Sequence, residues 1–385
     1  MSHNQSIHGL RGFAALIVVL LHIQVAVETA GFPLRLNPRG PAARMFAHGH
    51  HGVELFFMIS GYVIVRSLQR RTVPQFLAQR VRRIYPAFLA AHLAIFLAGP
   101  LVGYAFFTGL NWQEYVWLFT TNALMLPGYF AIPAANIVAW TLSLELAFYL
   151  LAASAVTLSR ACLRRPVRLA LWAIWLAAAI VSLYQHPRAW FFVAGVLAFA
   201  IEQKGNSPSA ANSAQETRTA WIALPAFAAM SCLARWSPSA AFLWGLVGFL
   251  GVMRQRDVFC RVLRGRVLQH LGDISYSLYL WHVLALYPLK RIFGGQHGLF
   301  GIAALDLIAF LASAAVLSWG TAWLSYRLVE RRFLPKTAEI RQSTIPQPHF
   351  SHKDRLGNNC RRRDNPVRHF LGDGQDCPSY HCDNR

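Results

Sequence analysis

The chain has 385 residues, of which 55% are hydrophobic and only 14% are charged, with a formal net charge of +21. A soluble protein of this length could not bury so much apolar side chain, so the composition excludes an ordinary soluble protein. It predicts instead an all-α, polytopic membrane protein. In a soluble chain the charge would favour a nucleic-acid partner, but here the arginines cluster between apolar runs. The positive-inside rule, by which arginines gather in the cytoplasmic loops of a membrane protein, explains them better. We therefore expect the protein to interact with the lipid bilayer and not with nucleic acid.

Ten apolar runs are candidates for transmembrane helices. They lie near residues 7–27, 51–68, 84–104, 138–158, 167–183, 188–202, 220–234, 239–253, 274–292 and 299–326. Several are shorter than the ~20 residues that a perpendicular span needs, so their ends must extend into flanking residues. An eleventh segment, 115–126, is short and carries Thr120, Thr121 and Asn122. We interpret it as interfacial or re-entrant on the outer side.

The distribution of arginine indicates the topology. If the N-terminus is cytoplasmic and 115–126 does not cross, the arginine-rich segments 66–83, 160–168, 254–266 and 327–336 all lie inside. Ten spans with both termini cytoplasmic therefore satisfy the positive-inside rule. Residues 1–340 form the membrane domain. The basic tail 341–385 has few apolar residues and no periodicity, which predicts disorder. The cysteines of the tail match no zinc-finger spacing, so we expect no metal site.

The first span is bracketed by Arg11 and His22. Eleven residues separate the two, so they share one face of a helix, roughly 16 Å apart along its axis. Arg11 alone could snorkel to the interface, and His22 alone could be a satisfied structural histidine. Because ionisable residues inside a membrane are costly, the pair on one face indicates a lined cavity.

Glu145 in the fourth span matches His22 in depth. His22 lies roughly 22 Å from the cytoplasmic edge and Glu145 roughly 10 Å from the outer edge of a core about 30 Å thick. A carboxylate beside an imidazole orients it as a general base, so we expect the two to be hydrogen-bonded. The alternative, that Glu145 pairs with another residue, is about as well supported.

Other polar residues fall inside the predicted spans. Ser60 and Gly61, near mid-depth in the second span, are typical of close helix packing. Most arginines in RVRRIYP, which opens the third span, are topology signals, although one or two could bind phosphate. The ninth span has a polar flank, formed by Ser275, Tyr276, Ser277 and Tyr279, which indicates a wetted cavity. His282 lies about 12 Å into the membrane.

Six segments in this order carry a family resemblance: IHGLRGFAALIVVLLH, GVELFFMISGY, RRIYP, WTLSLELAFY, LGDISYSLYLWH and RLVERRF. Together they cover about residues 5 to 335. The chain resembles the bacterial membrane O-acyltransferases of acyltransferase family three. The resemblance implies ten spans, a cytoplasmic acyl-coenzyme A donor and O-acylation of a sugar or glycolipid. The R-x10-H pair of the family falls on Arg11 and His22, and its W-S-L-x-x-E element falls on Trp140 and Glu145.

The resemblance and the residues together predict that the protein lies in the inner, cytoplasmic membrane of a bacterium. We expect the following assignments: His22, Glu145 and Arg11 as catalytic residues; Arg11, Arg80, Arg82, Arg83 and Tyr85 for the donor; and Ser60, Trp140, Tyr276 and His282 for the acceptor. Acyl-coenzyme A, acetyl by default, is expected as a co-substrate, with no permanently bound cofactor.

A second class of protein fits the same residues. Ten spans with intramembrane histidine, glutamate and aspartate, including Asp306, could form the proton relay of a secondary transporter, although no inverted repeat is evident. The sequence leaves open the acceptor, the acyl chain length, the oligomeric state and the choice between direct transfer and an acyl-enzyme.

Overall fold

The computed structural model describes residues 4–31, 46–205, 221–254, 257–294 and 299–333. Within these residues the protein is all-helical, apart from one isolated β-bridge between Pro127 and Phe130. The predicted disordered tail, 341–385, lies outside the described residues.

Each of the ten predicted apolar runs coincides with a helix. These helices are α1 (Gln5–Thr29), α3 (Gly52–Leu68), α4 (Val73–Ala98), α6 (Trp140–Arg160), α7 (Arg165–Gln185), α8 (Trp190–Gly205), α9 (Ala223–Leu233), α10 (Pro238–Met253), α12 (Arg266–Phe293) and α13 (Ala303–Ser325). The shorter elements are η1 (His48–His51), η2 (Ala105–Phe107), α5 (Trp112–Ala123), η3 (Pro187–Ala189), α11 (Phe259–Leu263), the π-helical turn η5 (Tyr326–Glu330) and α14 (Arg331–Phe333).

Six helical segments of the described chain are long and apolar enough to cross a membrane. They are Gln5–Thr29, His48–Leu68, Val73–Ala98, Trp140–Arg160, Arg165–Gln185 and Ala303–Phe333. Helices α8, α9 and α10 have 16, 11 and 16 residues, while α12 is long but more polar. The chain is therefore a multi-pass membrane protein.

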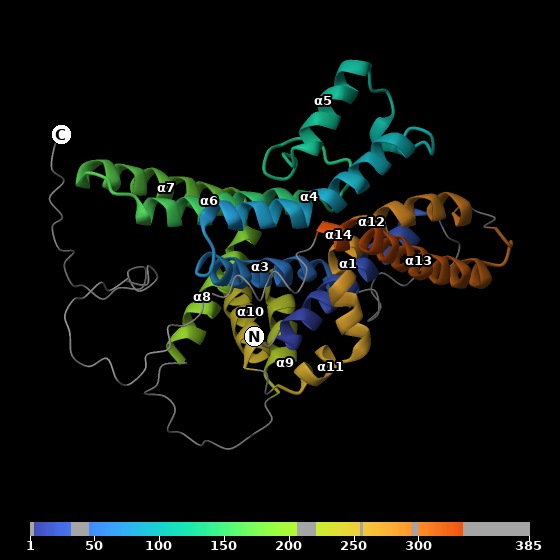
Figure 1. Cartoon of the computed structure of the whole chain (residues 1–385). Helices are drawn as coiled ribbons and strands as arrows, with labels where there is room; N and C mark the ends of the chain where they lie inside the picture. The colour runs from blue at the N-terminus through green and yellow to red at the C-terminus, as the bar shows by residue number, and fades with distance from the viewer. Residues whose placement is uncertain (1–3, 32–45, 206–220, 255–256, 295–298, 334–385) are drawn as a thin grey trace.

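Local sequence sets where several helices begin. The side chain of Asn4 caps α1 by accepting from the backbone N–H groups of Ser6 and Ile7 at 3.1 and 3.2 Å. Asn111 and Glu114 form a reciprocal capping box at the start of α5, with both bonds 2.9 Å long. That box fixes the short 115–126 segment as a separate helix, which lies beside the far end of α4 (Figure 1).

Two close helix pairs organise the interior. Helix α1 packs along α12, where a side chain at Gly272 would meet the backbone oxygen of His8 at 2.6 Å. Helix α3 packs along α8, where a side chain at Gly61 would clash with the backbone oxygen of Phe192, and one at Gly195 would clash with that of Met58. Small residues let helix backbones approach this closely in membranes. As a result, α1 and α3 lie at the centre of the molecule (Figure 1).

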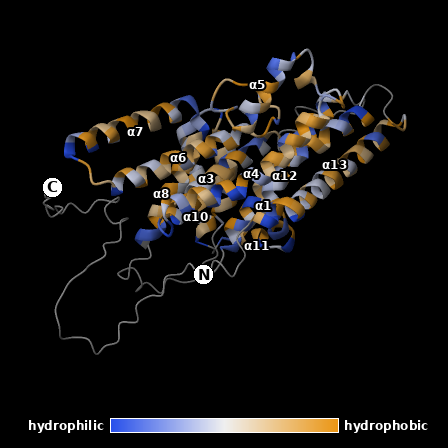
Figure 2. Ribbon diagram, turned by 45° about the horizontal axis from the view of Figure 1, so that its top comes forward, coloured by the Kyte–Doolittle hydropathy of each residue, from blue (hydrophilic) through white to orange (hydrophobic). Residues whose placement is uncertain are grey.

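Helix α7 is peripheral. Ser182 is its one buried residue, and its surface is mostly hydrophobic along its length (Figure 2). An apolar helix that is exposed in this way is suited to face lipid. Two hydrogen bonds connect α7 to the rest of the protein. Trp175 Nε1 donates to the carbonyl of Leu151 at 3.0 Å, and Ser182 Oγ lies 2.8 Å from Tyr129 OH.

Candidate active site

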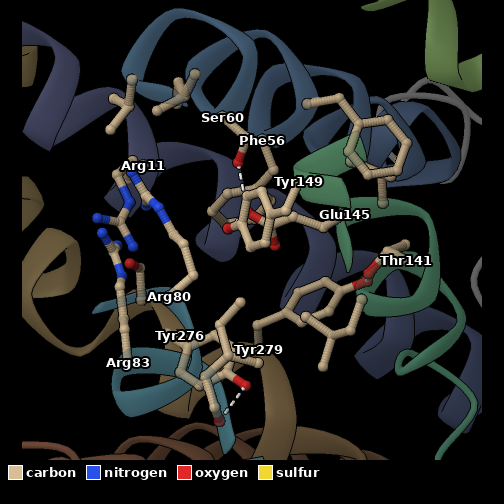
Figure 3. Close-up of a pocket in the computed structure, with 17 residues that line it drawn as sticks. Arg11, Phe56, Ser60, Arg80, Arg83, Thr141, Glu145, Tyr149, Tyr276 and Tyr279 are labelled. Carbon is tan, nitrogen blue, oxygen red and sulfur yellow. Dashed lines mark hydrogen bonds between the residues drawn. The ribbon is translucent and has the colours of Figure 1, made fainter. Parts of the chain in front are cut away.

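A cavity of about 80 Å³ lies among α1, α3, α4, α6 and α12. It brings together residues from these five helices, which lie far apart along the chain (Figure 3). Of the predicted site residues, it is lined by Arg11, Ser60, Arg80, Arg83, Glu145 and Tyr276. We call it the arginine pocket.

One end of the arginine pocket is strongly cationic. The guanidinium groups of Arg11, Arg80 and Arg83 gather there (Figure 3). Arg80 is buried, with its guanidinium carbon 5.2 Å from the ring centre of Phe76 and 5.4 Å from that of Tyr149. In the described part of the chain, none of the three arginines forms an ion pair with a carboxylate. Glu145 and Glu330 lie near enough to interact with the charge of Arg11, and Glu330 also interacts with that of Arg83. The three guanidinium groups outnumber these two carboxylates, so this end of the pocket favours an anionic ligand, and guanidinium groups bind phosphate bidentately.

Glu145 lies in the middle of the pocket and accepts two hydroxyl hydrogen bonds. Ser60 Oγ donates to its Oε1 at 2.7 Å from α3, and Tyr149 OH donates to the same oxygen at 2.5 Å from the next turn of α6. Gly61 supplies the close helix contact that the sequence suggested for Ser60, whose own hydroxyl holds the carboxylate. Hydrogen bonds of this kind stabilise a carboxylate in its charged form.

Hydroxyl groups at the far end of the pocket are bonded within the protein. Thr141 Oγ1 lies 3.0 Å from Tyr279 OH, which also donates to the carbonyl of Val138 at 3.0 Å. Tyr276 OH donates to the carbonyl of Ile84 at 2.9 Å. These bonds fix the two tyrosine rings as walls of the pocket.

His22 does not line the arginine pocket. Its ring packs against that of His282, with centroids 4.9 Å apart and ring planes at 63°. The expected hydrogen bond between His22 and Glu145 is therefore wrong, because Glu145 bonds to Ser60 and Tyr149. Equal depth in the membrane did not imply lateral contact: His22 faces α12, whereas Glu145 faces α3.

The two histidines have the same local hydrogen bond. Nδ1 of His22 lies 2.9 Å from the carbonyl oxygen of Val18, and Nδ1 of His282 lies 2.9 Å from that of Leu278. A carbonyl oxygen only accepts, so each Nδ1 carries the proton and each Nε2 carries the lone pair. His282 is fully buried, and its Nε2 has no hydrogen-bond partner among the described residues. Nε2 of His22 is therefore the nitrogen available as a base.

Tyr279 separates the histidine pair from the pocket. Its ring lines the pocket and lies 6.2 Å from the ring of His282, centre to centre, and 5.7 Å from that of Phe56. The sequence had marked Tyr279 only as part of a polar flank. It did not identify Thr141 or Tyr149, although Tyr149 follows Glu145 by one helical turn, which is the spacing of residues on one face.

Besides His22 and His282, three predicted site residues lie outside the arginine pocket. Arg82 is exposed, because the helical rotation turns it about 100° away from Arg83. Tyr85 packs beside Phe88, with ring centres 6.3 Å apart. Trp140 lies under the guanidinium of Arg188 at 5.6 Å. Within the described residues, no group of three or more metal-ligating side chains is placed to hold a metal ion.

A multi-pass helical fold with a cationic pocket and a half-buried carboxylate between its helices defines the class of this protein as an integral-membrane protein with a polar pocket between its helices. The particular family follows from comparison: a family model described as an acyltransferase domain matches residues 4–327. The chain therefore belongs to acyltransferase family three and is an O-acyltransferase.

Individual relatives are consistent with this assignment. The chain is 29% identical to the exopolysaccharide production protein ExoZ of Rhizobium meliloti (strain 1021), over 74% of this chain and 92% of the relative. It is 29% identical to the acyltransferase MdmB of Streptomyces mycarofaciens, over 76% of this chain and 81% of the relative. It is 25% identical to nodulation protein 10 of Rhizobium leguminosarum bv. viciae, over 70% of this chain and 79% of the relative. No solved structure is significantly similar to the chain.

Proposed function

We propose that the protein transfers an acyl group, acetyl by default, from cytoplasmic acyl-coenzyme A to a hydroxyl of a carbohydrate or glycolipid. The observation that carries this proposal is the cluster of Arg11, Arg80 and Arg83, which forms no ion pair with a carboxylate among the described residues and outnumbers the two nearby carboxylates, Glu145 and Glu330. Coenzyme A brings phosphate groups that would neutralise such a cluster. The printed name of one relative, an exopolysaccharide production protein, supports an exopolysaccharide or O-antigen acceptor.

The proposed topology places the two halves of the site on opposite sides of the bilayer. All ten helices matched to apolar runs cross the bacterial inner membrane, both termini are cytoplasmic, and α5 stays at the outer face. The positive-inside distribution of arginine supports this arrangement. Arg11 then lies in the cytoplasmic half and His22 in the outer half of α1, roughly 16 Å apart along the helix.

The proposed reaction uses His22 as general base. Nε2 of His22 takes the proton of the acceptor hydroxyl while the hydroxyl oxygen attacks the thioester carbonyl carbon. The carbon–sulfur bond breaks, an ester forms, and the coenzyme A thiolate leaves toward the cytoplasm and takes up the proton. Since Tyr279 lies between the pocket and the histidines, its hydroxyl has to release its bonds to Thr141 and Val138, and its ring has to turn aside, for the thioester to reach His22.

A proton-coupled transporter is not favoured. Its relay needs titratable groups in contact across the membrane, but Asp306 accepts from the backbone N–H groups of Leu299 and Phe300 at 2.8 and 2.9 Å. That aspartate therefore fixes the turn before α13. The matched family is moreover one of acyltransferases.

The test is acyl transfer by the purified protein in lipid nanodiscs. We expect acetyl-coenzyme A and an exopolysaccharide fraction to yield free coenzyme A together with an acetylated glycan, detected by mass spectrometry. In a deletion strain, loss of surface-glycan acetylation should be restored by the wild-type gene and not by Arg11→Ala. Normal glycan acetylation in the deletion strain would contradict the proposed acceptor class, and absence of any donor binding would contradict the proposed donor.

A further inference from the structure

A second, larger cavity lies behind one wall of the site. It has a volume of about 340 Å³, compared with about 80 Å³ for the arginine pocket, and lies among α3, α6, α7 and α8. Its lining is almost entirely apolar and includes Leu144, Leu151, Val156, Trp175, Leu183 and Val196. We call it the apolar cavity.

Helix α6 borders both spaces with neighbouring faces. Glu145 and Tyr149 line the arginine pocket, while Phe148, Leu151 and Ala152 line the apolar cavity. Residues 145 and 148 are adjacent on a helix surface because they are three positions apart. The apolar cavity is therefore next to the carboxylate site and not a remote surface feature.

A stack of three phenylalanine rings stands between the two spaces. Phe57 of α3 lines the arginine pocket, whereas Phe192 of α8 and Phe148 of α6 line the apolar cavity. The ring of Phe192 lies in the middle, 4.3 Å from Phe57 and 4.5 Å from Phe148 between centroids, with ring planes at 23° and 10°. We call these three residues the phenylalanine wall.

The wall is held in place by backbone packing. The backbone of Phe192 lies so close to α3 that a side chain at Gly61 would clash with its carbonyl oxygen. Phe57 and Phe192 are 3% and 0% exposed, so neither ring has free space in which to turn. Phe148 is only partly buried and lines the apolar cavity, so it is the member that can be shortened at least cost to the fold. Its removal gives the ring of Phe192, which stacks on it, the space to turn away from Phe57 and so opens the wall.

We propose that the phenylalanine wall sets the upper limit on the length of the acyl chain in the donor. This inference rests on the proposed acyl-coenzyme A donor. With the phosphates at the arginines, the acyl group is the apolar end of the donor and enters the apolar part of the pocket, where Val53, Phe56 and Phe57 stand. An acetyl group fits a space of about 80 Å³, whereas a longer chain meets the wall. Opening the wall joins the pocket to a cavity large and apolar enough to hold the added methylene groups.

The test is competition binding, which needs no acceptor. Protein in nanodiscs is loaded with radiolabelled acetyl-coenzyme A, which is displaced by unlabelled acetyl-, butanoyl-, hexanoyl- and octanoyl-coenzyme A. Wild-type protein should bind the octanoyl donor at least tenfold more weakly than the acetyl donor. Each buried methylene is worth a factor of about 4 in affinity, so Phe148→Ala should tighten octanoyl binding by tenfold or more. The affinity of Phe148→Ala for the acetyl donor should stay within about threefold of the wild-type value.

Two matched variants test whether the change in donor affinity comes from the phenylalanine wall. Phe199→Ala also removes a phenyl ring that lines the apolar cavity, but this ring packs on Tyr62 and is not part of the wall, so the octanoyl preference should be unchanged. Ala152→Phe fills the cavity one turn beyond Phe148 and should cancel the gain of Phe148→Ala in the double variant. If Phe148→Ala is not recovered as folded protein, Phe148→Leu should also bind the octanoyl donor more tightly than the wild type does, by a smaller factor.

Three outcomes would overturn the proposal. The first is equal binding of acetyl and octanoyl donors by the wild type. The second is an octanoyl gain in Phe199→Ala as large as that in Phe148→Ala. The third is folded Phe148→Ala protein in which acetyl and octanoyl affinities both stay at the wild-type values. In each case acetyl binding persists and the proposed donor stands. A wild type that binds none of the four donors would overturn the proposed function itself, and this inference with it.

Discussion

The rings of His22 and His282 pack at an angle, 4.9 Å apart between centroids, and each Nδ1 is bonded to the carbonyl oxygen of the preceding helical turn. The paired rings come from α1 and α12, the two helices that pack most extensively in the interior. Nε2 of His22, which the proposed reaction uses as the base, thus has its lone pair because Nδ1 is bonded to a backbone carbonyl and not to a carboxylate.

The first prediction concerns this base. His22→Ala should lower acyl transfer by about 10²–10⁴-fold, which is the usual loss on removing a positioned general base. Donor affinity should be unchanged, because His22 does not line the arginine pocket. Two quantities are measured: the rate of coenzyme A release at saturating donor, and the affinity for the donor. His270→Ala, which removes the exposed imidazole bonded to Trp319, is the control and should transfer at the wild-type rate. Near wild-type transfer by His22→Ala would show that another group is the base.

The second prediction separates neighbouring arginines. Arg11→Ala and Arg83→Ala should each weaken donor binding by about 10- to 100-fold, since a hydrogen bond to a charged group contributes about 1.5–3 kcal/mol. Arg82→Ala should have no effect, because Arg82 is exposed and outside the pocket. Arg11→Lys should recover part of the affinity, as lysine lacks the bidentate fork.

Isothermal titration with acetyl-coenzyme A measures these affinities. Equal losses in Arg82→Ala and Arg83→Ala would indicate a general effect of surface charge and would contradict phosphate binding inside the pocket.

The third prediction concerns the hydroxyl pair on Glu145. Glu145→Gln should reduce transfer, and Ser60→Ala and Tyr149→Phe should each reduce it by less, since each removes one of two hydrogen bonds to Oε1. The effects should be non-additive: Ser60→Ala should matter less when residue 145 is already glutamine. A double-mutant cycle on turnover measures this coupling. Strict additivity would mean that the contact between Ser60 and Glu145 has no functional consequence.

The fourth prediction is the topology. Reporter fusions at residues 129 and 137 should report the outer side, and fusions within 160–166 and 257–270 the cytoplasm, because arginine clusters stay inside. Alkaline phosphatase and green fluorescent protein fusions give opposite signals for each site. A cytoplasmic signal at residue 129 would mean that α5 crosses the membrane, which would move the arginines of 160–168 to the outer side and contradict the ten-span topology.

The helices of this protein could be located from sequence alone. Apolar length, capping residues and the 3.6-residue period are local properties, so all ten apolar runs overlap helices and 115–126 overlaps the separate helix α5. Only six of the helical segments reach the length and apolarity of a span, because α8, α9 and α10 are short and α12 carries a polar face. The family was also evident from sequence, since its motifs keep their order.

The partners of the buried polar residues were decided by tertiary structure. Sequence gave the depth and the helical face of Glu145 and His22, and both were compatible with a bond between them. Depth is a single coordinate, however, and the lateral arrangement of helices depends on which faces pack. The glycine contacts draw α1 onto α12 and α3 onto α8. That packing places His22 on His282 and leaves Glu145 to Ser60 and Tyr149, because helix–helix contacts form between residues with no fixed separation in sequence.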